Sequence, residues 1–248
     1  MDGFDATTYG ERIAEVYDEI HDARFDVPAT IDVLASLAGG GRVLELAIGT
    51  GRVAVPLAAR GLRVEGIDIS PAMVAKLREK PGGEAIPVTL GDFADVGVEG
   101  EFRLIYVVFN TLFALLTQEA QVRCFDRAAA HLATDGVFVV EGFVPDLGLY
   151  DRDGLRAKPT EIGVDRVSVD VGRLDAVAQR VDSTQVVLTE AGVKLYPVAL
   201  RYAWPSELDL MARLAGLELH QRWGGWHREP FGAESSMHVS VYGRPSQH

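Results

Sequence analysis

The sequence predicts an α/β protein with a doubly wound, mostly parallel sheet of seven strands, interrupted by an antiparallel β insert. Two observations indicate this class. Between residues 42 and 143, short apolar runs typical of buried strands alternate with helical segments, as in βαβ units. Between residues 157 and 203, three consecutive strand-like runs alternate in side-chain polarity and are separated by turn residues. The expected main domain is therefore Rossmann-like.

Two helices are expected before the first strand. Thr8 and Glu11 have the spacing of a capping box, and the apolar residues that follow recur at helical intervals, so a helix should begin there. A second helix should begin near Pro28 and end at the glycine run 39–41, because proline suits the first turn of a helix and glycine its carboxyl end.

Strands and helices then alternate. The expected strands of the main sheet are 42–46, 62–69, 85–92, 102–110, 136–143, 217–222 and 237–244. The expected helices are 52–61, 70–80, 117–133 and 206–216. Ser70 and Pro71 mark the second of these helices, as N-cap and first helical residue. The three strand-like runs of the insert are 165–175, 178–190 and 193–204.

The change in periodicity divides the chain into three parts. We expect an N-terminal helix over residues 1–26, a main domain formed by 27–156 and 204–248, and the antiparallel insert over 157–203. The insert would cover a pocket or form a dimer contact, because its edge strands suit self-association into a homo-oligomer.

Composition and charge narrow the class of partner. A formal net charge of −12 opposes binding to nucleic acid and favours small neutral or cationic molecules. The most apolar window, 104–116, is too short to span a bilayer, so no membrane partner is expected. The one cysteine, Cys124, needs no oxidising compartment, and a cytoplasmic protein is expected. No metal site is expected, since the histidines, cysteines and acids lack the spacing of metal ligands.

A glycine turn and two acids predict a ligand site. In open α/β sheets, ligands bind at the carboxyl ends of the strands, and Gly49 and Gly51 follow the first strand. Asp68 ends the second strand, 17 residues after Gly51. This is close to the sequence spacing at which an acid binds a ribose hydroxyl in such folds. With Ala54, the glycines also fit the dinucleotide fingerprint, but the buried acid Glu45 would repel a pyrophosphate and pair with a cation.

Four stretches resemble the class I S-adenosylmethionine-dependent methyltransferases in that family's order and spacing. They are 43–52, 64–74, 88–96 and 102–116. The resemblance implies S-adenosylmethionine as cofactor, with Glu45 at its amino group, Asp68 at the ribose and Asp92 near the adenine. The residues expected around the cofactor are Glu45, Ala47, Gly49, Gly51, Arg52, Asp68, Ile69, Met73, Asp92, Phe93 and Phe109. Ala47 replaces the family's usual glycine, which is tolerable if its backbone avoids positive φ.

The N-terminal segment resembles the lid helix of small-molecule methyltransferases from antibiotic and amino-sugar pathways, including lincosamide N-methyltransferases. The resemblance implies that Tyr9 and Tyr17 close over the reacting groups and that Glu141 orients the acceptor amine or takes its proton. Alternatively, the tyrosines only pack, and Glu141 ends a strand in solvent or pairs with an arginine. The residues expected near the acceptor are Asn110 and Phe113 after the fourth strand, and Trp226 in the glycine-containing loop 222–231.

The sequence therefore predicts a methyltransferase that uses S-adenosylmethionine to methylate a small molecule, at an amine nitrogen of a specialised metabolite such as an antibiotic. An O-methyltransferase on the same scaffold is the first alternative. A nicotinamide-dependent oxidoreductase is the second, and Glu45 disfavours it. A protein that binds the cofactor without catalysis is the third.

Overall fold

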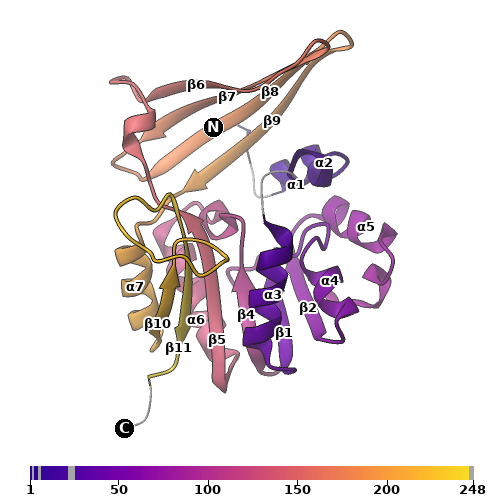
Figure 1. Ribbon diagram of the computed structural model, residues 1–248, viewed down its shortest axis with the longest axis vertical. Helices are drawn as coiled ribbons and strands as arrows, with labels where there is room; N and C mark the ends of the chain where they lie inside the picture. Colours follow the sequence, from indigo (N-terminus) through magenta and orange to yellow (C-terminus); the bar gives the residue numbers. More distant parts are fainter. Residues whose placement is uncertain (2, 5–6, 22–25, 246–248) are drawn as a thin grey trace.

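A computed structural model describes residues 1, 3–4, 7–21 and 26–245 of the chain. The main sheet has seven strands in the order β10-β11-β5-β4-β1-β2-β3 (Figure 1). Its strands are β1 (Arg42–Leu46), β2 (Arg63–Asp68), β3 (Val88–Leu90), β4 (Phe102–Val107), β5 (Leu132–Phe143), β10 (Glu218–Trp223) and β11 (Met237–Gly243). Only the pairings of β11 with β5 and β10 are antiparallel. The predicted fold class is confirmed.

Helices cover both faces of the main sheet. These helices are α3 (Val27–Ala38), α4 (Ala54–Ala59), α5 (Pro71–Glu79), α6 (Gln118–Ala130) and α7 (Pro205–Leu214). Each face of the sheet has its own hydrophobic core, because alternate residues of a strand point to opposite faces. Val43 belongs to the core with α3 and α4, and Leu44 to the core with α6 and α7. The short 3₁₀ helices are η1 (Gly83–Ala85), η2 (Thr111–Ala114) and η3 (Leu147–Leu149). In the described part of the chain, no helix has the length and apolarity to span a membrane.

Local signals set several helix ends as predicted. The Asp26 side chain accepts a hydrogen bond from the Ala29 N–H and caps α3, and Gly39 ends that helix with a φ of 54°. The Ser70 hydroxyl accepts from the Met73 N–H at the start of α5. These caps satisfy backbone groups that a helix end leaves open.

Two helix predictions were wrong. The N-terminal segment forms two short helices, α1 (Thr8–Ile13) and α2 (Tyr17–His21), and Thr8 is helical rather than capping. The expected capping box is absent from this segment because the Glu11 carboxylate instead accepts a hydrogen bond from Ser70 Oγ. Helix α6 ends at Ala130, three residues early, because β5 already begins at Leu132, which pairs with Phe102 of β4.

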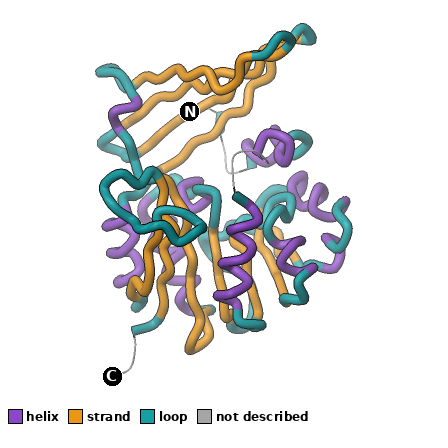
Figure 2. Tube along the Cα trace, in the orientation of Figure 1, coloured by secondary structure: helices purple, strands orange, loops and turns teal. Residues whose placement is uncertain are grey.

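The insert is a separate sheet of four antiparallel strands above the main sheet (Figure 1). Its strands are β6 (Leu155–Ile162), β7 (Arg166–Asp175), β8 (Arg180–Thr189) and β9 (Gly192–Arg201). Three were predicted, but β6 was missed because it is an exposed edge strand with a bulge next to Pro159. Among the described residues, no helix covers the outer face of this sheet, where Leu195 and Val193 are 50% and 61% exposed (Figure 2).

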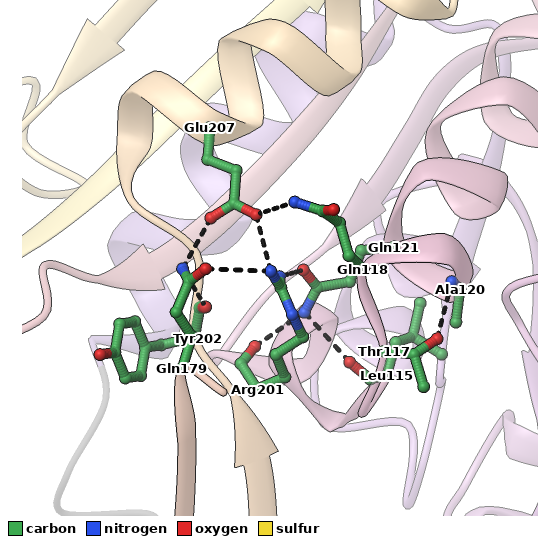
Figure 3. Close-up of polar contacts among 9 residues, drawn as sticks. All are labelled: Leu115, Thr117, Gln118, Ala120, Gln121, Gln179, Arg201, Tyr202 and Glu207. Carbon is green, nitrogen blue, oxygen red and sulfur yellow. Dashed lines mark hydrogen bonds and ion pairs between the residues drawn. The ribbon is translucent and has the colours of Figure 1, made fainter. Parts of the chain in front are cut away.

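A buried ion pair joins the insert to the main domain (Figure 3). Arg201, at the end of β9, pairs with Glu207 of α7 at 2.8 Å, and its side chain is 8% exposed. Its guanidinium also donates to Gln121 Oε1 of α6 and to Gln179 Oε1 in the β7–β8 turn. Gln179 and Gln118 donate to the two oxygens of the same Glu207 carboxylate. The network fixes the base of the insert to two helices.

Candidate active site

The glycine turn connects β1 to α4 at the carboxyl edge of the main sheet. Gly49 and Gly51 have φ of 56° and 72°, which glycine adopts without strain. A Cβ on Gly51 would lie 2.8 Å from Leu77 Cδ1, so a side chain there would force the turn and α5 apart. Ala47 has a φ of 57°, so the condition under which alanine would be tolerable in place of glycine is not met. The chain turns there because the Ile48 N–H still bonds to the Ile67 carbonyl of β2.

Two buried acids flank this turn. Glu45 of β1 is 5% exposed, and Asp68 at the end of β2 is 6% exposed. Asp68 accepts from the Gly49 N–H at 2.7 Å and from the Ser70 N–H at 2.8 Å, so it holds the turn against the start of α5. Burial raises the pKa of Asp68, against the lowering effect of these two N–H groups.

The carboxyl group of Glu45 is held by a neighbour that sequence reasoning missed. Tyr106 of β4 lies beside Glu45 in the register of the sheet and donates its hydroxyl to Glu45 Oε2 at 2.8 Å. Burial raises the pKa of Glu45 to about 8, with the hydrogen bond from Tyr106 opposing it and Asp68 reinforcing it. A cation bound beside Glu45 would favour its ionised form.

We expect Glu45→Gln to stabilise the protein without bound ligand, and increasingly so as pH rises. The pKa of Glu45 is higher in the folded state than in the unfolded state, so between about pH 4.5 and pH 8 the folded state keeps a proton that the unfolded state has lost. Over this range the free energy of unfolding of the wild type therefore falls as pH rises. Gln removes this titration. Between about pH 5.5 and pH 8.5 the stability advantage of the variant over wild type should grow by about 3 kcal/mol, at about 1.4 kcal/mol per pKa unit. Thermal unfolding at both pH values measures it, and an advantage that stays constant would contradict it.

Arg52 places a positive charge among these groups. Its guanidinium carbon lies 4.3 Å from the centre of the Phe109 ring and 5.3 Å from that of Tyr17. Burial raises the pKa of Tyr17, and the Arg52 charge opposes that rise. Arg52 also favours the ionised forms of Glu45 and Glu141. The structure thus brings together predicted residues from the first turn, the lid and the end of β4.

The turn after β4 is strained and held to β5. Phe109 and Asn110 have φ of 57° and 65°, a conformation that costs energy in residues other than glycine. The Phe109 N–H donates to Glu141 Oε2 at 2.8 Å, and Asn110 Oδ1 accepts from the Phe143 N–H at 2.7 Å. Two side-chain contacts to the end of β5 therefore stabilise the turn.

Glu141 is buried rather than exposed, with 4% of its surface accessible, so the solvent alternative is excluded. Burial raises its pKa to about 7, and the Phe109 N–H, Trp226 and Arg52 oppose that rise. Trp226 is 6% exposed, and its indole N–H lies near this carboxyl without forming a hydrogen bond of good geometry. Trp226 and Glu141 thus lie together beneath the β4 turn.

The N-terminal helices lie beside the glycine turn and α5. Pairs between acids of the helices and residues of the main domain are Glu11–Ser70 (3.2 Å), Glu15–Lys76 (3.0 Å), Asp18–Lys80 (2.5 Å) and Asp18–Thr50 (2.6 Å). A Cβ on Gly10 would lie 2.6 Å from Ser70 Cβ, so α1 packs directly on the start of α5. The Tyr9 and Tyr17 rings meet edge to face at 6.4 Å.

A cavity of about 630 Å³ lies between the insert, helix α1 and the carboxyl edge of the main sheet. Tyr9, Asn110 and Phe143 line it on the side of the main sheet, and Tyr196 and Val198 of β9 on the side of the insert. Its volume suits a drug-sized molecule. Residues of the insert therefore form one wall of this cavity.

Several other predicted residues do not line this cavity. Phe113 is 1% exposed, packs against Phe143 with ring centres 5.0 Å apart, and does not line the cavity. Phe93 is 7% exposed within a core cluster, and Asp92 accepts a hydrogen bond from the Ala94 N–H. Ile69 is half-buried, and Met73 packs against the lid helices. In the described residues, no group of three or more histidines, cysteines or acids is arranged to hold a metal.

Comparisons with known proteins agree with this geometry. A sequence profile described as "Methyltransferase domain" matches residues 43–136. The solved structure of the CcbJ methyltransferase from Streptomyces caelestis has a TM-score of 0.91 and 40% sequence identity, over 98% of this chain and 100% of that chain. The cypemycin N-terminal methyltransferase of a Streptomyces species is 27% identical over 97% of this chain and 99% of its own length. The dTDP-3-amino-3,6-dideoxy-alpha-D-glucopyranose N,N-dimethyltransferase of Streptomyces fradiae is 31% identical and matches 54% of each chain.

The doubly wound sheet, the glycine turn and the acids beside it define a Rossmann-like methyltransferase. The chain belongs to the S-adenosylmethionine-dependent methyltransferases, and S-adenosylmethionine is its cofactor. The predictions of family, enzyme class and cofactor are confirmed.

Proposed function

We propose that the protein transfers a methyl group from S-adenosylmethionine to an amine nitrogen of a small molecule of specialised metabolism. The observation that carries the proposal is the position of the cavity. It ends at Tyr9 and Asn110, next to the turn residue Phe109, whose ring lies against Arg52 of the glycine turn. Cofactor and acceptor sites therefore meet at the carboxyl edge of the sheet.

The residues beside the glycine turn suit this cofactor. The cofactor supplies a methyl group on a positively charged sulfur. We propose that Glu45 binds the amino group of the cofactor, Asp68 its ribose hydroxyls and Arg52 its carboxylate. The buried acids and the close approach of backbone at Gly49 favour this cationic nucleoside over a pyrophosphate, which two buried carboxylates would repel. The Tyr9 and Tyr17 rings would exclude water above it and offer π faces to the cation.

The lining of the cavity favours an amine over a hydroxyl acceptor. An amine needs only to be neutral when it attacks, whereas a hydroxyl usually needs a base to remove its proton. Within the described ranges, no lining residue is a histidine, the commonest such base. The amino-sugar relative is named as an N,N-dimethyltransferase and the cypemycin relative as an N-terminal methyltransferase, and both names support an amine acceptor here.

The experiment that tests the function is a methyl-transfer assay with S-adenosylmethionine, by mass spectrometry, on matched panels of primary and secondary amines and of their hydroxyl counterparts. Transfer to amines alone is the expected result. Transfer to hydroxyl groups alone would make the protein an O-methyltransferase. Calorimetry with S-adenosylhomocysteine and NAD provides the control, and binding of NAD instead would favour an oxidoreductase.

We propose that Glu141 acts as a positioning residue that holds the strained turn at Phe109 and Asn110. Its carboxyl group contacts the Phe109 N–H and does not line the cavity. An amide oxygen can accept the same hydrogen bond, so Glu141→Gln should retain kcat within about threefold above pH 8. It should also lose the pH dependence near pH 7 that the carboxyl adds in wild type.

Glu141→Ala is the matched variant. It leaves the Phe109 N–H buried without its acceptor, so kcat should fall by about tenfold and the melting temperature should drop. The pH profiles of kcat for wild type and both variants, with one amine, measure these effects. Loss of activity at every pH in Glu141→Gln would instead indicate a direct role in proton transfer.

Two further features concern the setting of the reaction. Cys124 is a buried thiol and needs no oxidising compartment, which supports our proposal that the protein acts in the cytoplasm. The outer face of the insert exposes apolar side chains, and we propose that two copies of the chain associate through this face. This association would not involve the active site.

A further inference from the structure

The cavity has two chemically different walls. Apolar side chains form the row of the insert nearest the main sheet: Leu174, Val181 and Leu200. A polar strip crosses the inner face of the insert further from that edge, and it includes Arg156, Asp170, Ser183 and Gln185. An acceptor that fills the cavity would therefore need both an apolar and a polar part.

The register of the strands builds the strip. Arg156 of β6 and Ser183 of β8 lie on either side of Gly172, and Asp170 follows one row further along β7. Ser183 Oγ donates to the Asp170 carboxylate, and Arg156 Nη2 lies 3.4 Å from the other carboxylate oxygen. The Arg156 and Asp170 side chains are 21% and 29% exposed. Both retain hydrogen-bonding capacity toward the cavity, because a guanidinium has five N–H groups and a carboxylate about four lone pairs.

Gly172 lies in the middle of the strip, and the Tyr150 ring lies against it. A Cβ on Gly172 would lie 3.6 Å from Tyr150 Cε1 and 3.7 Å from Ser183 Oγ, which is ordinary van der Waals contact. The backbone of Gly172 does not have a positive φ. The folded chain therefore has room for an alanine here, and the Tyr150 ring, which lines the cavity, covers the strand between Arg156 and Ser183.

The charge of the lining limits what can bind. Among the lining residues in the described ranges, Arg156 is the one cation, and Asp146 and Asp170 are acids. A diphosphate would enter a site with no surplus positive charge and would meet the Asp170 carboxylate. A hydroxyl group can donate to the carboxylate and accept from the guanidinium at the same time.

We propose that Arg156, Asp170 and Ser183 form a specificity subsite that binds hydroxyl groups of the acceptor and disfavours phosphate. This proposal rests on the proposed N-methyl transfer. The acceptor is then an amine with an apolar part and a hydroxylated, sugar-like part, and it carries no nucleoside diphosphate. This differs from the nucleotide-linked sugar in the name of the Streptomyces fradiae relative.

Three probes test the acceptor class: hexyl 3-amino-3,6-dideoxyglucopyranoside, the dTDP-linked form of the same amino sugar, and a trialanine peptide with a free N-terminus. Methyl transfer and binding to the protein loaded with S-adenosylhomocysteine are measured for each. We expect the hexyl glycoside to have a kcat/KM at least about tenfold above those of the other two. Equal or better use of the nucleotide or the peptide would overturn the proposal, and so would failure to bind the glycoside.

Variants test the residues. Arg156→Met and Asp170→Asn should each raise the KM for the glycoside by about tenfold, with kcat within about twofold and the affinity for S-adenosylhomocysteine unchanged. The control is Arg173→Met, because Arg173 is exposed on the outer face of β7.

The outcomes separate this proposal from the proposed function. An unchanged KM in Arg156→Met and Asp170→Asn, with amines still methylated, would overturn the subsite alone. Absence of methyl transfer to any amine, with S-adenosylhomocysteine still bound, would overturn the proposed function and the subsite together.

Discussion

Asp68→Ala should weaken binding of S-adenosylmethionine and S-adenosylhomocysteine by at least about 100-fold. The carboxylate of Asp68 accepts from the N–H groups of Gly49 and Ser70, so it holds both the glycine turn and the start of α5 in position. Hydrogen bonds to a charged group contribute about 1.5–3 kcal/mol each, and the variant also loses the proposed contact to the ribose. Calorimetry with both ligands measures the effect.

A conservative variant separates binding from folding. Asp68→Asn retains an amide oxygen for one of the two N–H groups, so it should fold with a smaller loss of melting temperature and still bind the cofactor at least about tenfold more weakly. Asp95→Ala is the matched control, because Asp95 forms only an exposed pair with Arg123. Normal cofactor affinity in both Asp68 variants would show that the ligand binds away from this turn.

Arg201→Met should lower the free energy of unfolding by about 1.5–3 kcal/mol, because it removes the charged donor to Gln121 and leaves the half-buried Glu207 carboxylate without its cationic partner. Burial alone would raise the pKa of Glu207, but hydrogen bonds from Gln179, Arg201 and Gln118 keep it below its usual value. The same change releases the base of β9 from α6 and α7. The KM for the acceptor should therefore rise more than the dissociation constant of S-adenosylhomocysteine.

The double variant Arg201→Met with Glu207→Gln provides the sharper comparison. Removing both charges avoids the unpaired carboxylate, so the double variant should be more stable than Arg201→Met alone. Arg123→Met is the control on an exposed ion pair and should change stability by less than about 1 kcal/mol. Urea unfolding measures all three, and a loss below about 1 kcal/mol in Arg201→Met would mean that this network does not hold the insert.

The parts of the fold that could be predicted depend on local signals. Ser70 marks the start of α5 because its side chain caps a backbone N–H three residues later. The glycines and Asp68 mark the cofactor turn because they directly follow or end a strand. Strand β6 lacks such a signal. Its residues are mostly exposed and include Pro159, so no alternation of polarity distinguishes it from a loop.

The parts of the site that could not be predicted depend on neighbours distant in the sequence. Tyr106 reaches Glu45 only because β4 lies beside β1, and nothing in either strand alone indicates this order. The alternation of β7 shows that Asp170 and Leu174 share a face but not that this face meets a cavity. The positive φ of Ala47 likewise depends on the bond between Ile48 and β2.

The pairing of β5 with β11 also affects how the chain folds during synthesis. β5 and its partner are separated in the sequence by the whole insert, by α7 and by β10, so this pairing has a high contact order. Until β11 has been synthesised, the apolar β5 has an open edge, and such an edge promotes aggregation of incomplete chains. The antiparallel strand that completes the sheet therefore also protects the nascent protein.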